Sequence, residues 1–193
     1  IAASPAHDGS PRQFHGSVPY SSGTTGKPKG VMRQPASPEA LARMIEITQA
    51  VLGIKQGMRT AMVAPLYHSA PASYGMQSLL FGDLVVIHER FEAERLLAEI
   101  ERHRLDRLYL VPTHFVRPLR LPDEVKRRYD LSSIEFVAST GSPCPPEVKK
   151  QMIDWWGPVI NEFYGSTESS AVTLASSADT LAKPGTVGKA VEG

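Results

Sequence analysis

Residues 21–30 read Ser-Ser-Gly-Thr-Thr-Gly-Lys-Pro-Lys-Gly, and this stretch decides most of what the sequence predicts. Its glycines and its proline oppose a helix, and it offers little apolar surface to a packed strand. Hydroxyl groups, ammonium groups and the backbone N–H groups of a glycine-rich loop are donors that bind phosphate. The stretch therefore predicts a phosphate-binding loop. The alternative is a Gly/Ser/Thr linker or a hairpin turn.

The loop does not have the spacing of a Walker A motif. A Walker A motif places four residues between its two glycines and follows them with Gly-Lys and Ser or Thr. Here Gly23 and Gly26 enclose two residues, and Lys27 is followed by Pro28. A nucleoside triphosphatase of the Walker A type is therefore not the class that this loop predicts.

The composition narrows the classes of protein further. The 193 residues are 41% hydrophobic, which suffices for one domain-sized core. Lys and Arg number 21 and Asp and Glu number 20, so the net charge of +1 gives no reason to expect nucleic acid or a membrane surface as a partner. The single cysteine, Cys144, excludes an internal disulfide and fits a cytoplasmic protein. No apolar run reaches the length of a membrane span.

The order of apolar runs and breakers predicts alternating strands and helices. Residues 1–17 have no periodicity and are expected to be irregular or disordered, whereas 18–193 are expected to form one domain. Ser37 and Pro38 are typical of a helix start, and Gly53 ends the apolar pattern that follows. The continuous apolar run at 84–87 predicts a buried parallel strand. The other expected strands are 30–32, 60–64, 108–111, 134–138 and 159–164, and the other expected helices are 92–103, 113–119 and 145–156. This alternation predicts an α/β fold with mostly parallel strands flanked by helices, and no closing element is expected after Ser169.

Four segments, in order, resemble motifs of the adenylate-forming superfamily, which includes acyl-CoA synthetases, luciferases and the adenylation domains of peptide synthetases. They are the loop at 21–30, Pro-Leu-Tyr-His at 65–68, Gly-Ser-Pro at 141–143 and Tyr-Gly-Ser-Thr-Glu at 164–168. The resemblance extends from Tyr20 to the end of the sequence and is greatest to fatty acid–CoA ligases. It implies that the chain is an internal piece of the large N-terminal domain of such an enzyme.

The resemblance also implies a nucleotide site. ATP phosphates would be bound by the loop residues Ser21, Ser22, Gly23, Thr24, Thr25, Gly26, Lys27 and Lys29. Adenine would lie between Tyr164 and the segment formed by Gly141, Ser142 and Pro143. Thr167 would contact the α-phosphate, and Glu168 would be the ligand of Mg²⁺, a hard cation that prefers carboxylate oxygen.

A slot for the acid is implied as well, lined by His68, Ala70, Tyr74, Phe163 and Gly165. His68 would act as a gate between this slot and the channel for the thiol, although a lone histidine is more often a structural residue. Acetate-specific relatives carry tryptophan where this chain has Gly165, so the resemblance favours an acid larger than acetate. Phe163 is bulkier than the glycine of many relatives and would shorten the slot.

The predicted function is that of an ATP-dependent carboxylic acid–CoA ligase that uses Mg²⁺ and takes CoA as its co-substrate. One alternative is a peptide-synthetase adenylation domain, whose acceptor is the thiol of a carrier protein. The other is a non-catalytic nucleotide-binding fragment, because the sequence contains no Thr-Gly-Asp motif for the ribose and no small C-terminal domain with its adenylation lysine. The isolated chain is therefore expected to be inactive.

Overall fold

The computed structural model describes residues 18–21, 26–32 and 36–191. The lead at 1–17, for which irregular structure was expected, lies outside the described residues. The chain divides into two compact units, 1–34 and 35–193, and each is described by itself. One domain over 18–193 stays a prediction.

The first unit contains a short antiparallel hairpin. Strand β1 (Tyr20–Ser21) pairs with strand β2 (Lys29–Gly30), with Tyr20 opposite Gly30. The N–H of Val31 donates to the carbonyl of Pro19 at 2.8 Å, which extends the pairing by one bond. The expected strand at 30–32 thus begins one residue earlier. The hairpin arrangement is compatible with both sequence interpretations, because a phosphate loop and a plain turn can each join two strands.

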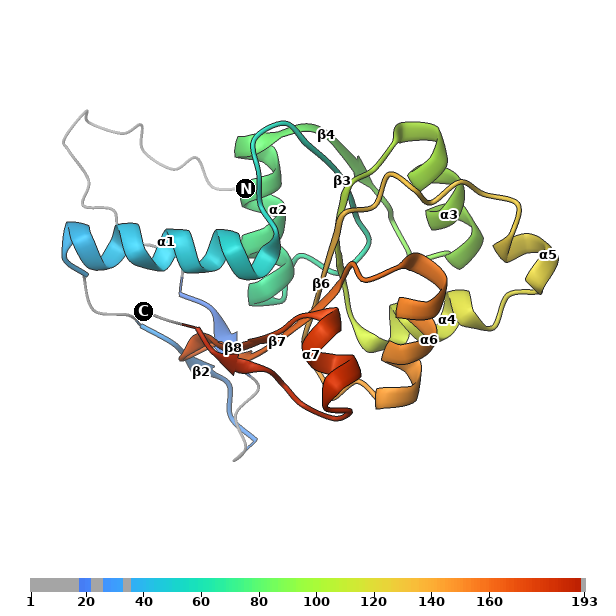
Figure 1. Ribbon diagram of the computed structural model, residues 1–193. Helices are drawn as coiled ribbons and strands as arrows, with labels where there is room; N and C mark the ends of the chain where they lie inside the picture. Colours follow the sequence, from blue (N-terminus) through green and yellow to red (C-terminus); the bar gives the residue numbers. More distant parts are fainter. Residues whose placement is uncertain (1–17, 22–25, 33–35, 192–193) are drawn as a thin grey trace, which may run out of the picture. The chain divides into compact units, whose positions relative to one another are not determined.

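The second unit is a helix-flanked sheet with the strand order β4-β3-β5-β6-β7-β8-β9 (Figure 1). The strands from β4 to β7 pair in parallel, and β8 and β9 add antiparallel pairs. The strands are β3 (Met58–Met62), β4 (Gly82–Ile87), β5 (Arg107–Leu110), β6 (Phe136–Ser139), β7 (Ile160–Ser166), β8 (Ser170–Ala175) and β9 (Lys189–Ala190). The helices are α1 (Pro38–Leu52), α2 (Ser69–Phe81), α3 (Ala93–His103), α4 (Pro112–Leu119), α5 (Asp123–Lys126), α6 (Pro146–Trp156) and α7 (Ser177–Ala182). The predicted α/β class with mostly parallel strands is confirmed.

Helix α1 shows why the helix boundaries could be predicted. The Ser37 side chain caps the helix by accepting a hydrogen bond from the N–H of Ala40, and Pro38 is its first residue. Gly53 ends the helix in the left-handed region, at φ 66°. A Cβ atom there would lie 2.3 Å from the Phe136 ring, so both the backbone angle and the space require glycine.

Two sequence expectations were wrong. The run at 84–87 is an edge strand with one parallel neighbour in the described part of the chain, and Ile87 is 65% exposed. The tail after Ser169 does form further elements, namely β8, α7 and β9. The sequence does contain short signals for α7 and β8. Ser176 and Asp179 form a capping box at the start of α7. Strand β8 contains Val172 and Thr173, residue types that favour strands.

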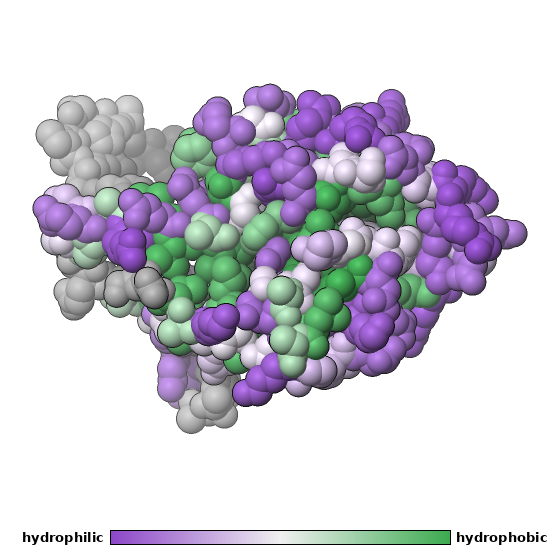
Figure 2. Space-filling view, viewed as in Figure 1, coloured by the Kyte–Doolittle hydropathy of each residue, from purple (hydrophilic) through white to green (hydrophobic). Residues whose placement is uncertain are grey.

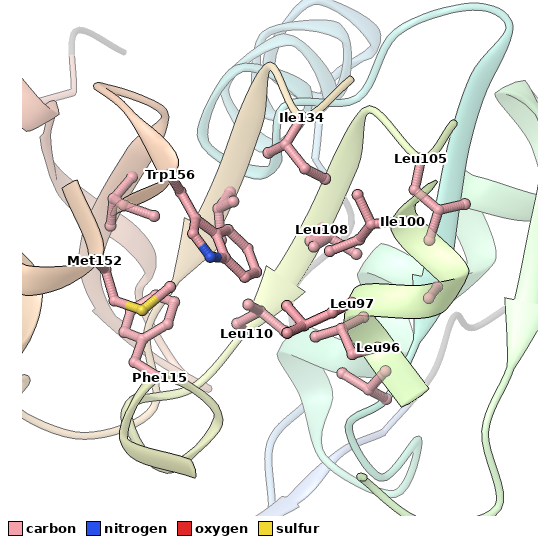
Figure 3. Close-up of a cluster of buried hydrophobic side chains, with 14 of the residues drawn as sticks. Leu96, Leu97, Ile100, Leu105, Leu108, Leu110, Phe115, Ile134, Met152 and Trp156 are labelled. Atoms are coloured by element: carbon pink, nitrogen blue, oxygen red, sulfur yellow. The ribbon is translucent and has the colours of Figure 1, made fainter. Parts of the chain in front are cut away.

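The core lies on both faces of the sheet. Helices α3, α4 and α6 cover one face, and α1 and α2 contribute to the cluster on the other. Strand β5 shows the alternation, because Leu108 and Leu110 join the first cluster while Tyr109 joins the second. Figure 3 shows the first cluster, in which side chains of β5 meet those of the helices: Leu108, Leu110, Leu96, Leu97, Ile100, Phe115, Met152 and Trp156. None of the described helices is both long and apolar enough for a membrane crossing.

His114 on α4 is a buried histidine with a low pKa. Its ring stacks on Phe91 with 4.3 Å between centroids, and its Nδ1 accepts a hydrogen bond from the N–H of Val111 at 3.4 Å. Burial, followed by the charge of Arg117, lowers the pKa of His114 to about 4. The ring is therefore neutral over most of the physiological range.

We expect this histidine to lower the free energy of unfolding by about 2 kcal/mol between about pH 7 and pH 5. The pKa in the folded chain lies below the ordinary value of 6.5, so the unfolded chain takes up the proton first and acidification favours unfolding. His114→Asn keeps an acceptor for the Val111 N–H and removes the proton site. Urea denaturation at the two pH values measures the change. A variant that retains the whole pH dependence would contradict the assignment.

Candidate functional site

The predicted adenine segments lie together because of the register of two parallel strands. Ser139 at the end of β6 pairs with Glu162 on β7, so the segment 141–143 and Tyr164 both follow this pair at the same edge of the sheet. The carboxyl ends of parallel strands are where ligands bind in open α/β sheets. Tyr164 is 59% exposed. Gly141, Ser142 and Pro143 are also exposed, and the strand register places them next to Tyr164. A flat ring can stack on Tyr164 from solvent.

Gly141 starts this segment with a backbone angle that favours glycine. Its φ is 98°, in the region that L side chains rarely adopt. Three residues after Gly141 the chain turns inward again, and the Cys144 side chain is buried in the core. The exposed segment 141–143 is therefore anchored at its C-terminal end by Cys144 and forms a short wall beside Tyr164.

The tip between β7 and β8 holds the predicted metal ligand. The Ser166 Oγ accepts hydrogen bonds from the N–H groups of Glu168 at 3.2 Å and of Ser169 at 3.0 Å, and the two serine hydroxyls lie 3.1 Å apart. These bonds fix the backbone of the tip. The Glu168 carboxylate is exposed, and it forms no ion pair with any described residue. It is thus available to a cation.

The segment that carries His68 folds across the strand ends toward this tip. The Oγ of Ser69 lies 3.4 Å from the Oγ1 of Thr167, a long contact between two hydroxyls. Strands β5 and β6 separate β3 from β7, so the contact spans about 14 Å of sheet. His68 is exposed on this segment and packs against the Tyr67 ring at 4.5 Å. The structure thus brings His68, Thr167 and Glu168 to one edge.

Most of the residues expected to line an acid slot do not lie at this edge of the sheet. Tyr74 is fully buried, and its hydroxyl lies 2.6 Å from the Oγ1 of Thr60. Burial raises the pKa of Tyr74 above its usual range. Phe163 is buried in the same cluster, and Ala70 packs against it. In the described chain these side chains form core, and only Gly165 and His68 of the expected set lie at the site edge.

Gly165 has a structural reason to be glycine. A Cβ atom built there would lie 1.9 Å from the carbonyl oxygen of Ser170 on the neighbouring strand. The strands approach closely at this point because the register of β7 and β8 shifts between Tyr164 and Gly165. The glycine is therefore accounted for without any reference to the size of a substrate.

We expect Gly165→Ala to lower the free energy of unfolding by about 1–3 kcal/mol, because the strands must move apart to admit the methyl group. Thermal denaturation measures the loss. Val172→Ala on β8 is the matched control, since Val172 is 41% exposed and its truncation should change the stability by less than about 0.5 kcal/mol. Equal melting temperatures for the Gly165 variant and the parent protein would contradict this account.

The predicted phosphate loop lies partly within the described residues. Ser22, Gly23, Thr24 and Thr25 lie outside the described residues, as does the side chain of Ser21. Lys27 and Lys29 are exposed, and Gly26 has a φ of 82°. No group of three His, Cys, Asp or Glu side chains with the spacing of a metal site occurs among the described residues. A cation here would take one carboxylate from the protein and its remaining ligands from phosphates and water, which is usual for Mg²⁺.

Two hollows in the described part of the chain lie away from this edge. One, of about 330 Å³, is beside Trp155 and Trp156 of α6, and the other, of about 310 Å³, is lined by Ile47, Val51 and Leu174. Figure 2 shows hydrophilic side chains over α3 and α5 and hydrophobic ones beside α1. Neither hollow contains a residue of the four sequence motifs, and Tyr164 and Glu168 of the candidate site are exposed.

The profile of the family described as AMP-binding enzyme matches residues 16–193. The chain belongs to this family. It is 34% identical to a probable CoA ligase of Humulus lupulus over 156 residues, which are 79% of this chain and 28% of the relative. It is 32% identical to the mitochondrial medium-chain acyl-CoA ligase ACSF2 of Danio rerio over 164 residues, 81% of this chain and 26% of the relative.

A solved structure of a CoA synthetase has a similar fold. The o-succinylbenzoate CoA synthetase of Bacillus subtilis, in complex with ATP and a magnesium ion, matches with a TM-score of 0.72 and 27% identity. The match covers 93% of this chain and 36% of that one. This chain spans roughly a quarter of the length of the two curated relatives named above.

Sequence reasoning missed the residues that shape the site without touching a ligand. Ser166 and Ser169 hold the tip, and Ser69 reaches across to it. The spacing of the two serines around Thr-Glu is the pattern of a hydroxyl-stabilised turn, so that signal was available. The contact of Ser69 had no local signal, because it joins segments 98 residues apart.

Proposed function

We propose that this chain forms part of an ATP-dependent carboxylic acid–CoA ligase. The observation that carries the proposal is the convergence of Tyr164, Thr167 and Glu168 with the segment 141–143 and with His68 at one edge of the sheet. Membership of the AMP-binding family and the CoA ligases among its relatives support the same reaction class.

The reaction proceeds in two transfers. A carboxylate oxygen of the acid bonds to the α-phosphorus of ATP, and the bond to the bridging oxygen breaks so that pyrophosphate leaves. The CoA thiol then loses its proton to solvent, its sulfur bonds to the acyl carbon, and AMP leaves with the electron pair of the broken C–O bond. Both steps develop charge on phosphate oxygens, so fixed donors and a cation at these oxygens are the main contributions that a protein can make.

The residues predicted for the site have distinct tasks in this scheme. Tyr164 stacks on adenine against the wall formed by Gly141, Ser142 and Pro143. The Thr167 hydroxyl donates to the α-phosphate, and the loop at 21–30 binds the remaining phosphates through Ser21, Ser22, Thr24, Thr25, Lys27, Lys29 and the N–H groups of Gly23 and Gly26. Glu168 would hold Mg²⁺, which would supply charge neutralisation on the phosphate oxygens. His68 stands between the acid and the incoming thiol.

We propose an acid larger than acetate as the substrate. The support comes from relatives whose names include a medium-chain acyl-CoA ligase and an o-succinylbenzoate CoA synthetase. Gly165 alone does not indicate a large acid, because the close approach of the Ser170 carbonyl oxygen also requires glycine at this position. The cytoplasmic location expected from the sequence stays a prediction, since one of the relatives is mitochondrial.

The test is acid-dependent exchange of labelled pyrophosphate into ATP by the complete protein that contains this chain. Medium-chain, long-chain and aromatic acids should each be assayed beside acetate, with Mg²⁺ present. The expected result is exchange with at least one larger acid and, after addition of CoA, the matching acyl-CoA. Exchange without thioester formation would favour a carrier-protein thiol as the acceptor. Absence of any acid-dependent exchange would contradict the proposal.

A further inference from the structure

Helix α6 buries an ammonium group where its sequence would suit an apolar side chain. Lys149 shares the helical spacing of Met152, Ile153 and Trp156, all of which are buried. The Lys149 side chain is 2% exposed and its Nζ lies 2.5 Å from the Oε2 of Glu162, whose side chain is 7% exposed. A buried ion pair generally adds no stability over apolar side chains of similar size. Stability alone therefore gives no reason for this pair.

The pair joins three segments that surround the candidate nucleotide site. Helix α6 begins three residues after Pro143, the last residue of the adenine wall. Glu162 lies on β7 two residues before Tyr164, and alternation places both side chains on the same face of the sheet. The Lys149 Nζ also donates to the carbonyl of Thr186, at 3.4 Å, in the loop between α7 and β9. One ammonium group thus connects the base of the wall, the strand that carries Tyr164, and a third loop.

The charges of the pair also act on Cys144, the residue that anchors the wall. It follows Pro143 directly and is buried. Burial, followed by the Glu162 carboxylate, raises the pKa of the Cys144 thiol to about 11, whereas the Lys149 ammonium lowers it. Both charges are thus close enough to act on the residue that anchors the wall.

We propose that Lys149 is a positioning residue for adenine, acting through Glu162 to set the distance between the Tyr164 ring and the segment 141–143. The inference rests on the proposed function, because it takes that gap to be the adenine site. The proposal predicts an effect on adenine and none on the acid. Loss of the pair weakens recognition of the base, while binding of the acid is unaffected.

The test uses the complete protein and the double variant Lys149→Met/Glu162→Leu, in which two apolar side chains replace the pair and no charge is left unpaired. Pyrophosphate exchange gives the KM for ATP, the KM for the acid and the preference for ATP over GTP. We expect the KM for ATP to rise about tenfold and the preference for ATP to fall about tenfold, which corresponds to about 1.4 kcal/mol. The melting temperature and the KM for the acid should stay near those of the parent protein.

Lys150→Met is the matched control, because Lys150 follows Lys149 directly but is half exposed and pairs with Asp154 at the surface. It should leave all of these quantities unchanged. A folded double variant with unaltered KM for ATP and unaltered base preference would overturn the proposal. So would a double variant that no longer folds, since the pair would then be a stability element. A parent protein without acid-dependent exchange would refute the proposed function, and this inference with it.

Discussion

Glu168→Gln is expected to slow acid-dependent pyrophosphate exchange by about 100-fold in the complete protein. The amide has the size of the carboxylate but no negative charge, so it is a weak ligand for Mg²⁺. Glu168 belongs to no group of three or more possible metal ligands among the described residues, so it is the one carboxylate that the sequence motifs assign to the cation. Its exposure and its place at a hydrogen-bonded tip indicate that the substitution leaves the fold intact.

Glu124→Gln on α5 is the control for this experiment, since Glu124 is also exposed and lies on a helix remote from the tip (Figure 1). Exchange by the control variant should equal that of the parent protein. Raising the Mg²⁺ concentration should restore part of the rate of the Glu168 variant. An unchanged rate in the Glu168 variant would remove this residue from the site.

The 193-residue chain alone is expected to form no acyl-CoA when given ATP, Mg²⁺, CoA and a panel of acids. It spans roughly a quarter of the length of the relatives named above, and its sequence holds no Thr-Gly-Asp motif for the ribose. The resemblance assigns the adenylation lysine to a small domain beyond these residues. A missing ribose contact would weaken ATP binding by about 1–3 kcal/mol.

Mass spectrometry of the reaction mixture detects both the acyl-adenylate and the acyl-CoA. The complete protein, assayed at the same concentration, is the positive control. Turnover by the 193-residue chain would show that these residues contain a catalytic apparatus that neither the motifs nor the fold indicates.

The elements with strong local signals could be predicted from the sequence. The Ser37 cap, the Gly53 stop and the apolar runs of β5, β6 and β7 each depend on neighbouring residues, and the structure has them within two residues of the expected bounds. The edge position of β4 could not be read from its apolar run, because sheet order depends on contacts between distant segments. The run Ala171-Val172-Thr173-Leu174 is too short to predict a strand by itself, and it forms β8 as the antiparallel partner of β7.

The candidate site could likewise be predicted only where the signal is local. The sequence motifs named Tyr164, Thr167, Glu168 and the segment 141–143, and the register of β6 and β7 brings them to one edge. Tyr74 could not be placed in the core from sequence, since an aromatic residue on a helix suits a pocket wall and a core equally well. The pair of Lys149 and Glu162 was missed for a related reason. Charged side chains are mostly exposed, and only helical spacing hinted that Lys149 faces inward.

The central claim is that adenine binds between Tyr164 and the segment 141–143, and photolabelling tests it most directly. The complete protein is irradiated with 8-azido-ATP and Mg²⁺, digested, and mapped by mass spectrometry, with and without excess ATP. We expect ATP-protected label on the peptides that contain residues 141–143 or Tyr164. Protected label confined to another surface, such as the hollow beside Trp155 and Trp156, would contradict the account.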